Sequence, residues 1–108
     1  MLDKMKRLLG AEGTEERDEL FSDLIEIASK RLKLLIGAND VPEQLEYIVV
    51  DVAIMRFNRI GSEGINHHTV EGELAIYAVD DFKPYAADIQ AYKASVGADN
   101  GSYKVKFV

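Results

Sequence analysis

The strongest hydrophobic pattern in the chain predicts a long amphipathic helix. Between residues 20 and 36 apolar side chains recur every three or four positions, the spacing that places them on one face of an α-helix. The stripe consists of Leu20, Leu24, Ala28, Leu32 and Leu35, flanked by Phe21, Ile25 and Ile36. Thr14 suits an N-cap, and Gly37 follows the last apolar position, where helices commonly end. We therefore expect a helix that starts after Thr14 and stops at Gly37.

A second, mainly apolar stripe predicts another long helix. Its members are Leu45, Ile48, Val49, Val52, Met55, Arg56 and Ile60. The start is open by a residue or two, because Pro42 fits a first helical turn while Asp40 and Glu43 have the spacing of a capping box. Gly61 is expected to close the helix. The short connection between the two long helices favours an antiparallel arrangement.

Weaker patterns predict elements at both ends of this pair. Residues 2–9 read as a short helix with Met5, Leu8 and Leu9 on one side. A last helix, capped by Asp80 or Asp81 with Pro84 in its first turn, is expected to stop at Gly97. Its stripe is Phe82, Tyr85, Ile89, Tyr92 and Val96. Partial alternation over residues 69–78 predicts a strand or small hairpin before this helix.

The predicted fold is mainly α: a small helical bundle of two long antiparallel helices and a shorter C-terminal helix, with a small β element between the second and third helices. Residues 1–97 form one domain, with the short helix at residues 2–9 and the core at residues 14–97. Residues 98–108 form a flexible tail with a strand-like end. Leu24, Leu32, Ile48 and Val52 are expected to pack between the long helices.

Composition narrows the class of protein. The 108 residues suit one domain, and 13 basic against 19 acidic residues give a formal net charge of −6. This balance argues against a dedicated nucleic-acid binder and against docking on anionic membranes. The absence of cysteine excludes disulfides, thiolate metal sites and cysteine nucleophiles. No apolar run is long enough to cross a bilayer, and the N-terminus has no apolar core of the kind a signal peptide needs.

Candidate catalytic or metal-binding groups are sparse. His67 and His68 are adjacent, and neighbouring residues of an extended segment point to opposite faces, so exposed loop histidines are the simpler interpretation. Asp80 and Asp81 could form an acid–base pair, but aspartate at a helix start is usually a cap. The glycines of Gly61-Ser62-Glu63-Gly64 lack the lysine and the preceding strand of a phosphate loop. We expect no enzyme activity, no metal and no cofactor.

Three segments in a fixed order resemble a known family. They are Arg56-Phe57-Asn58-Arg59-Ile60-Gly61-Ser62-Glu63-Gly64, then Val70-Glu71-Gly72, then Asp80-Asp81-Phe82-Lys83-Pro84-Tyr85. Together they are similar to the small head–tail connector, or adaptor, proteins of tailed phages and prophages, over roughly residues 14–95.

The resemblance implies a structural protein of the virion, made in the host cytoplasm and placed at the head–tail junction. It implies a homo-oligomeric, dodecameric ring under the portal protein. Such a ring extends the DNA channel and offers a surface to a head-closure or tail protein, while DNA passes without sequence-specific binding. An acidic lumen would repel the phosphate backbone, in agreement with the net charge.

Two surfaces are predicted to make contacts in such an assembly. Arg56 and Arg59 lie in sequence near Glu63, Glu71 and Glu73, so arginine–carboxylate pairs between neighbouring subunits are available. Favourable positive charge at a helix C-terminus is an alternative role for the two arginines. In the tail, strand-like alternation makes Tyr103, Val105 and Phe107 candidate anchors on a partner's sheet edge.

Two other classes of function stay open. A small DNA-binding regulator of helix-turn-helix type would need a basic recognition helix and would give a salt-dependent gel shift. A small hydrolase or metal enzyme would need His67, His68 and carboxylates gathered around an ion, and the spacing does not favour such a cluster.

Overall fold

A computed structural model describes residues 1–63 and 80–100, with side chains described for residues 1–60 and 80–97. The elements, in order, are α1 (Leu2–Leu9), α2 (Asp18–Ile36), the 3-10 turn η1 (Glu43–Leu45), α3 (Glu46–Glu63), the 3-10 turn η2 (Lys83–Tyr85) and α5 (Ala86–Asn100). The mainly α class is confirmed, and the described residues contain no strand. The β element predicted at residues 69–78 and the strand-like end of the predicted tail lie outside the described residues.

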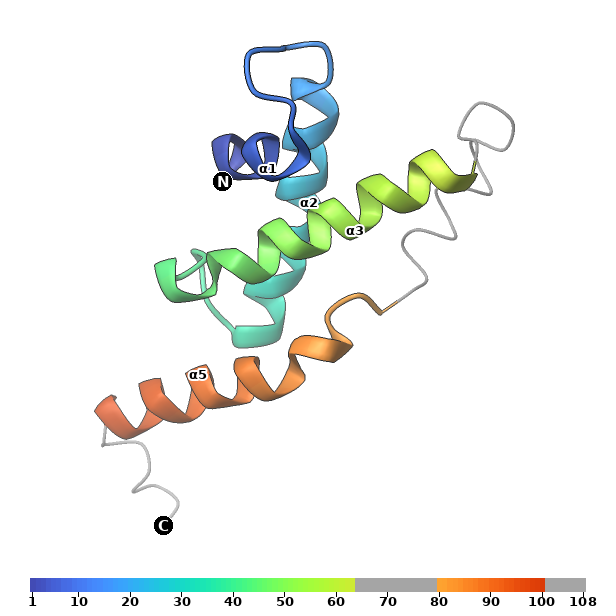
Figure 1. The fold of residues 1–108 in the computed structure, drawn as a ribbon. Helices are drawn as coiled ribbons and strands as arrows, with labels where there is room; N and C mark the ends of the chain where they lie inside the picture. The colour runs from blue at the N-terminus through green and yellow to red at the C-terminus, as the bar shows by residue number, and fades with distance from the viewer. Residues whose placement is uncertain (64–79, 101–108) are drawn as a thin grey trace.

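The core forms where α3 runs back obliquely across α2 (Figure 1). From α2 it takes Leu24, Ala28 and Leu32 of the predicted stripe, together with the flanking Phe21 and Ile25. The other predicted members, Leu20, Leu35 and Ile36, are only partly buried against it. From η1 and α3 it takes Leu45, Ile48, Val49, Val50, Val52 and Ala53. The four residues predicted to pack between the long helices are each at most 3% exposed, so that prediction is confirmed.

α1 packs against both α2 and α3 and has the predicted bounds. Gly10 follows it with a left-handed φ of 71°, and its N–H closes the last turn on the Arg7 carbonyl. Met5 is fully buried, but Leu8, which was predicted to share one side of the helix with it, is 58% exposed. α1 therefore reaches the core mainly through Met5 and leaves Leu8 at the surface.

The predicted start of α2 is wrong. The helix begins at Asp18 with Arg17 as N-cap, and no side-chain hydrogen bond caps it. Thr14 instead donates its hydroxyl to the Ala11 carbonyl oxygen at 3.0 Å, within the turn that precedes the helix. Lys6 Nζ of α1 lies 2.8 Å from Asp18 Oδ1 and also donates a hydrogen bond to the Thr14 carbonyl oxygen. A contact with α1 therefore fixes the residues that lead into α2.

Of the three glycines expected to end the long and C-terminal helices, one does so. Gly37 adopts φ 68° and terminates α2 as predicted. α3 continues through Gly61 to Glu63, and α5 continues through Gly97 to Asn100, so both predicted stops are wrong. Glycine inside a helix costs only about 1 kcal/mol relative to alanine, which the adjoining helical turns can offset.

The second long helix is preceded by a 3-10 turn that begins after Pro42. Pro42 is the N-cap of η1, with an extended ψ of 146°, and η1 leads directly into α3. No side-chain hydrogen bond caps this turn, so Asp40 and Glu43 do not form a capping box. The β-branched run within α3 is helical, because Val49, Val50 and Val52 are all buried in the core.

α5 runs back along α3 in the opposite direction (Figure 1). The segment is anchored by Phe82, which is 3% exposed, and by Ile89, which is 6% exposed. Tyr85 and Tyr92 are partly buried beside them. Within residues 1–63 and 80–100, no helix is long and apolar enough to cross a membrane.

Candidate functional site

A buried ionic cluster joins the C-terminal half of α3 to the residues just before η2. Asp81 accepts a hydrogen bond from Arg56 Nε at 3.1 Å. It also accepts two from Arg59, from Nη1 at 3.1 Å and from Nη2 at 2.6 Å, in a two-pronged arrangement. The Asp81 side chain is 3% exposed and that of Arg56 6%. Such a cluster fixes the position of the α5 segment relative to α3.

Burial alone would raise the pKa of the Asp81 carboxyl, because desolvation penalises its charged form. Hydrogen bonds from Arg59 and Arg56, together with their positive charges, outweigh burial and hold the pKa of Asp81 below its ordinary value. Asp81 is therefore ionised at neutral pH and is engaged by the two arginines. Arg56 also stacks over the Phe82 ring, with its guanidinium carbon 5.9 Å from the ring centroid.

Two tyrosine–carboxylate hydrogen bonds continue the connection between α3 and α5. The Tyr85 hydroxyl donates to Asp51 Oδ2 at 2.9 Å, and the Tyr47 hydroxyl donates to Asp88. The rings of Tyr47 and Tyr85 meet edge to face, with centroids 6.3 Å apart. Each bond joins one residue of α3 to one of the η2–α5 segment.

The order of these pairs defines the direction of packing. From the C-terminal end of α3 towards its start, the pairs are Arg59–Asp81, Asp51–Tyr85 and Tyr47–Asp88. Numbers fall along α3 while they rise along the partner segment, so the two run antiparallel. Long polar side chains bridge them, in contrast to the apolar contact between α2 and α3.

Alkaline titration tests the Tyr85 bond. Burial, followed by the hydrogen bond to Asp51 and its negative charge, raises the pKa of Tyr85 to about 12. A group whose pKa is raised on folding stabilises the fold below its unfolded pKa of about 10, and this contribution is lost as pH rises towards the folded value. The free energy of unfolding of the wild type should therefore fall between pH 10 and 12 more steeply than that of Tyr85→Phe.

The control is Tyr92→Phe, since Tyr92 has no carboxylate partner among the residues whose side chains are described. It should keep the wild-type slope, measured by urea unfolding at each pH. Parallel slopes for the wild type and Tyr85→Phe would contradict the assignment.

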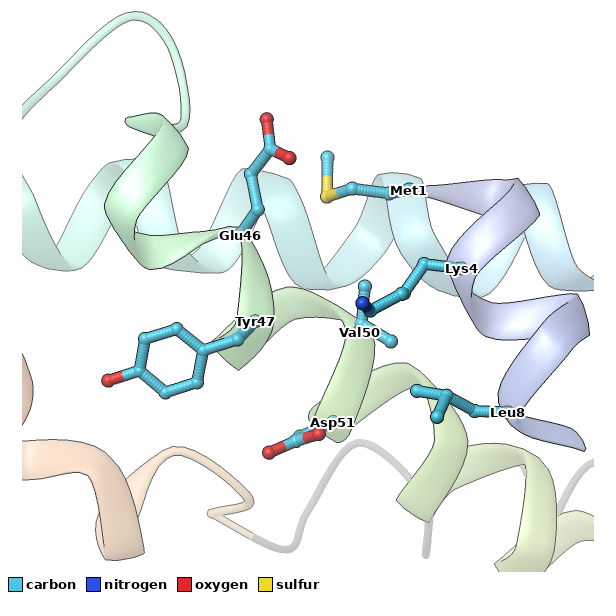
Figure 2. A pocket seen from close by; sticks show the side chains of 7 residues that line it. All are labelled: Met1, Lys4, Leu8, Glu46, Tyr47, Val50 and Asp51. Atoms are coloured by element: carbon cyan, nitrogen blue, oxygen red, sulfur yellow. The ribbon is translucent and has the colours of Figure 1, made fainter.

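The described surface also carries one groove between α1 and the first turns of α3. It has a volume of about 290 Å³ and is lined by Met1, Lys4, Leu8, Glu46, Tyr47, Val50 and Asp51. Figure 2 shows Lys4 and Leu8 extending from α1 towards α3, where Val50 lies, with Tyr47 and Asp51 projecting from α3 on the side away from α1. The side chains that line the groove are therefore apolar ones together with two carboxylates and the basic side chain of Lys4.

The residues predicted to form a subunit contact divide into two groups. Arg56 and Arg59 pair with Asp81 of their own chain, and Arg56 is only 5% exposed. Glu63 is the last residue of α3, and its side chain lies outside the described residues. Glu71, Glu73, Tyr103, Val105 and Phe107 lie wholly outside them. The structure thus gives the arginines a partner within the subunit, and the contact between subunits stays a prediction.

Asp81 is the residue whose role sequence reasoning missed. It was interpreted as a helix cap or one half of an acid–base pair, whereas Asp80 provides the local turn by accepting a hydrogen bond from the Phe82 N–H at 3.2 Å. The available signal was Arg56 and Arg59, three positions apart on one helix face. Two arginines on a face that is otherwise packed require a buried anion.

No feature of the described site supports acid–base or metal chemistry. Asp81 is held by arginines, and its neighbour Asp80 forms a backbone turn. The described residues contain no group of three or more histidine, cysteine, aspartate or glutamate side chains arranged to hold a metal ion. His67 and His68 lie outside them. The site instead holds helices in place, as in a small structural protein.

This helical structural module matches a family model described as phage gp6-like head-tail connector protein, over residues 1–93. The chain belongs to this family, so it is a structural component of a phage virion. The match begins at residue 1 and therefore takes in α1, which the sequence resemblance had left out. No curated protein and no solved structure matched the chain.

Proposed function

We propose that the protein forms a closed ring at the portal vertex, joins the phage head to the tail and extends the DNA channel. The observation that carries this proposal is the family match over residues 1–93. The portal protein is the partner on the head side, and a head-closure or tail protein is the partner on the other. Membership of the family supports contact with head and tail components, and the ring is our proposal for how one small subunit meets both.

The charge of the chain supports a channel through which DNA slides. A formal net charge of −6 creates a potential that repels the phosphate backbone, so DNA is not retained by non-specific binding. The two arginines that might have offered phosphate contacts are occupied by Asp81. Passage without binding is what a connector needs during packaging and ejection.

Two contacts predicted from the sequence belong to this proposal. The first was predicted as pairs of Arg56 and Arg59 with Glu63, Glu71 and Glu73 of a neighbouring subunit. Because both arginines bind Asp81 of their own chain, we propose that they contribute to the assembly by holding α5 against α3, while the glutamates face the neighbour. Residues 98–108, with Tyr103, Val105 and Phe107 as anchors, would bind a sheet edge of a neighbour or of the portal protein. Through these two regions one subunit would contact its neighbours or the portal protein.

Mass measurement in solution tests the ring. The chain, alone or mixed with its portal protein, should give a discrete complex to which it contributes an integral multiple of 12.0 kDa. A closed ring predicts one dominant stoichiometry, because a heterologous contact either closes or continues as a filament. A chain that stays monomeric both alone and with the portal protein would contradict the proposal.

A further inference from the structure

Several large apolar side chains remain exposed to solvent after folding, and most of them line the groove between α1 and α3. Within the described side chains, four large hydrophobic residues are exposed: Met1 at 38%, Leu8 at 58%, Tyr47 at 46% and Leu34 at 72%. The first three line the groove between α1 and α3, whose floor includes the buried Val50. Apolar side chains gathered in one recess are typical of a binding surface, whereas single scattered ones are not.

The fourth residue, Leu34, lies near the C-terminal end of α2 on the face turned away from the core. It does not line the groove of its own chain. Its neighbours on that face and in the adjoining turn are Lys30, Arg31 and Lys33, of which the first two are exposed. Leu34 is therefore an exposed apolar side chain surrounded by basic residues.

The two surfaces are complementary in charge. Among its side chains, the groove carries the carboxylates of Glu46 and Asp51 against the one basic side chain of Lys4. The Asp51 carboxylate also accepts the Tyr85 hydrogen bond. The Leu34 surface carries three positive charges, with Lys30 shared with Glu26 of its own helix at 3.2 Å. Opposite potentials across a contact steer two surfaces together and set their register.

We propose that the groove of one copy of this protein receives Leu34 of a neighbouring copy. A cavity of roughly 150 Å³ can hold a benzene-sized group, so the groove, at about 290 Å³, can admit a leucine side chain with part of a flanking residue. Lys30 and Arg31 of the entering copy then lie near Glu46 and Asp51 of the receiving copy. Both apolar surfaces leave water in a single contact.

This contact is heterologous, because the surface that enters differs from the surface that receives. A heterologous contact leaves each copy with one free groove and one free Leu34, so copies add in one direction until the ring closes. The inference rests on the proposed ring and specifies the surfaces that build it.

Site-directed cross-linking tests the pairing, because the chain has no cysteine of its own. Leu34→Cys and Leu8→Cys, each at an exposed position, are mixed well above the wild-type assembly concentration, because each substitution also removes part of the contact, and are treated with a short bis-maleimide. The mixture should give a covalent dimer containing one copy of each variant, and the double variant should give a ladder that ends at the ring. Each single variant alone should give much less dimer.

The outcomes separate this inference from the proposed function. Rings that form normally while the cysteines at 8 and 34 fail to cross-link would overturn the pairing and leave the ring intact. Dimers of Leu34→Cys with itself, as abundant as the mixed dimer, would also overturn it by indicating a symmetric contact. Absence of any ring, alone or with the portal protein, would overturn both proposals.

Substitution of Leu34 gives a second measurement. Leu34→Ser should raise the concentration needed for assembly by about tenfold or more, since burying a leucine side chain contributes at least that factor. Arg31→Glu and Glu46→Arg should each weaken assembly, and the two together should restore part of it. Lys93→Glu, the same charge change at an exposed position of α5, is the matched control and should leave assembly unchanged. Equal assembly by Leu34→Ser and the wild type would contradict the contact.

Discussion

Asp81→Asn is expected to lower the free energy of unfolding by about 3–5 kcal/mol, because removing one member of a buried ion pair leaves the remaining charges uncompensated. Asparagine keeps the shape of the side chain, but it cannot supply the negative charge that Arg56 and Arg59 share. Urea unfolding followed by helical circular dichroism measures the loss. Since a domain of this size has a stability of only about 5–15 kcal/mol, the variant should lose a large fraction of it and unfold at a clearly lower urea concentration than the wild type.

The adjacent Asp80→Asn is the matched control. It removes the same charge one residue away, and asparagine can still accept the hydrogen bond from the Phe82 N–H. Its stability should stay close to that of the wild type. Equal stability of the two variants would show that the ionic cluster contributes little to the fold.

The pH dependence provides an independent check on Asp81. A carboxyl whose pKa is lower in the folded than in the unfolded state stabilises the fold above its unfolded pKa of about 4. That contribution is lost as pH falls through the lower, folded value. The difference in stability between the wild type and Asp81→Asn should therefore be full at pH 7 and should shrink below pH 4. A difference that does not change with pH would contradict the ionised state of Asp81.

Leu32→Ala and Ile48→Ala are each expected to cost about 2–5 kcal/mol, from lost apolar burial and from the cavity left behind. Both side chains are fully buried between α2 and α3. The shift of the urea midpoint, with the dependence of the unfolding free energy on urea concentration unchanged, measures the loss of stability.

Leu34→Ala is the matched control for the core prediction. It is the same change on the same helix, two residues after Leu32, but at a side chain that is 72% exposed. Below the concentration at which subunits assemble, its stability should lie within about 0.5 kcal/mol of the wild type. Similar losses for Leu32→Ala and Leu34→Ala would mean that the face of α2 is wrongly assigned.

Helices and their buried faces could be predicted because they depend on local periodicity. Leu24, Ala28 and Leu32 of the stripe predicted on α2 are buried as expected. On α3 the predicted Ile48, Val49 and Val52 are buried as well, whereas Met55 and Ile60 are only partly buried. Gly37 ends α2 because the chain turns left-handed there. Gly61 and Gly97 have the same side chain, yet they lie inside helices, since a glycine permits a helix end without requiring one.

The candidate site was only partly predictable. The arginines at positions 56 and 59 were singled out from the sequence, but their partner was sought among nearby glutamates. From the sequence alone, either Asp80 or Asp81 could accept a hydrogen bond from the local backbone, and in the structure Asp80 does so. Deciding between the two aspartates requires knowing which side chain faces α3, and that depends on how the η2–α5 segment packs. The same is true of Thr14, where Lys6 of α1 organises the turn that a cap was expected to form.

By itself, then, the sequence determined the helical class, the faces that are buried and the family to which the chain belongs, because periodic spacing and the order of short segments are properties of the chain alone. The tertiary structure alone decided that Asp81 receives both arginines, that α5 lies antiparallel to α3 and that exposed Leu8 and Tyr47 line a common groove. These features depend on contacts between residues far apart in the chain. Several local alternatives have similar energies at such positions, and the packing of the helices selects one of them.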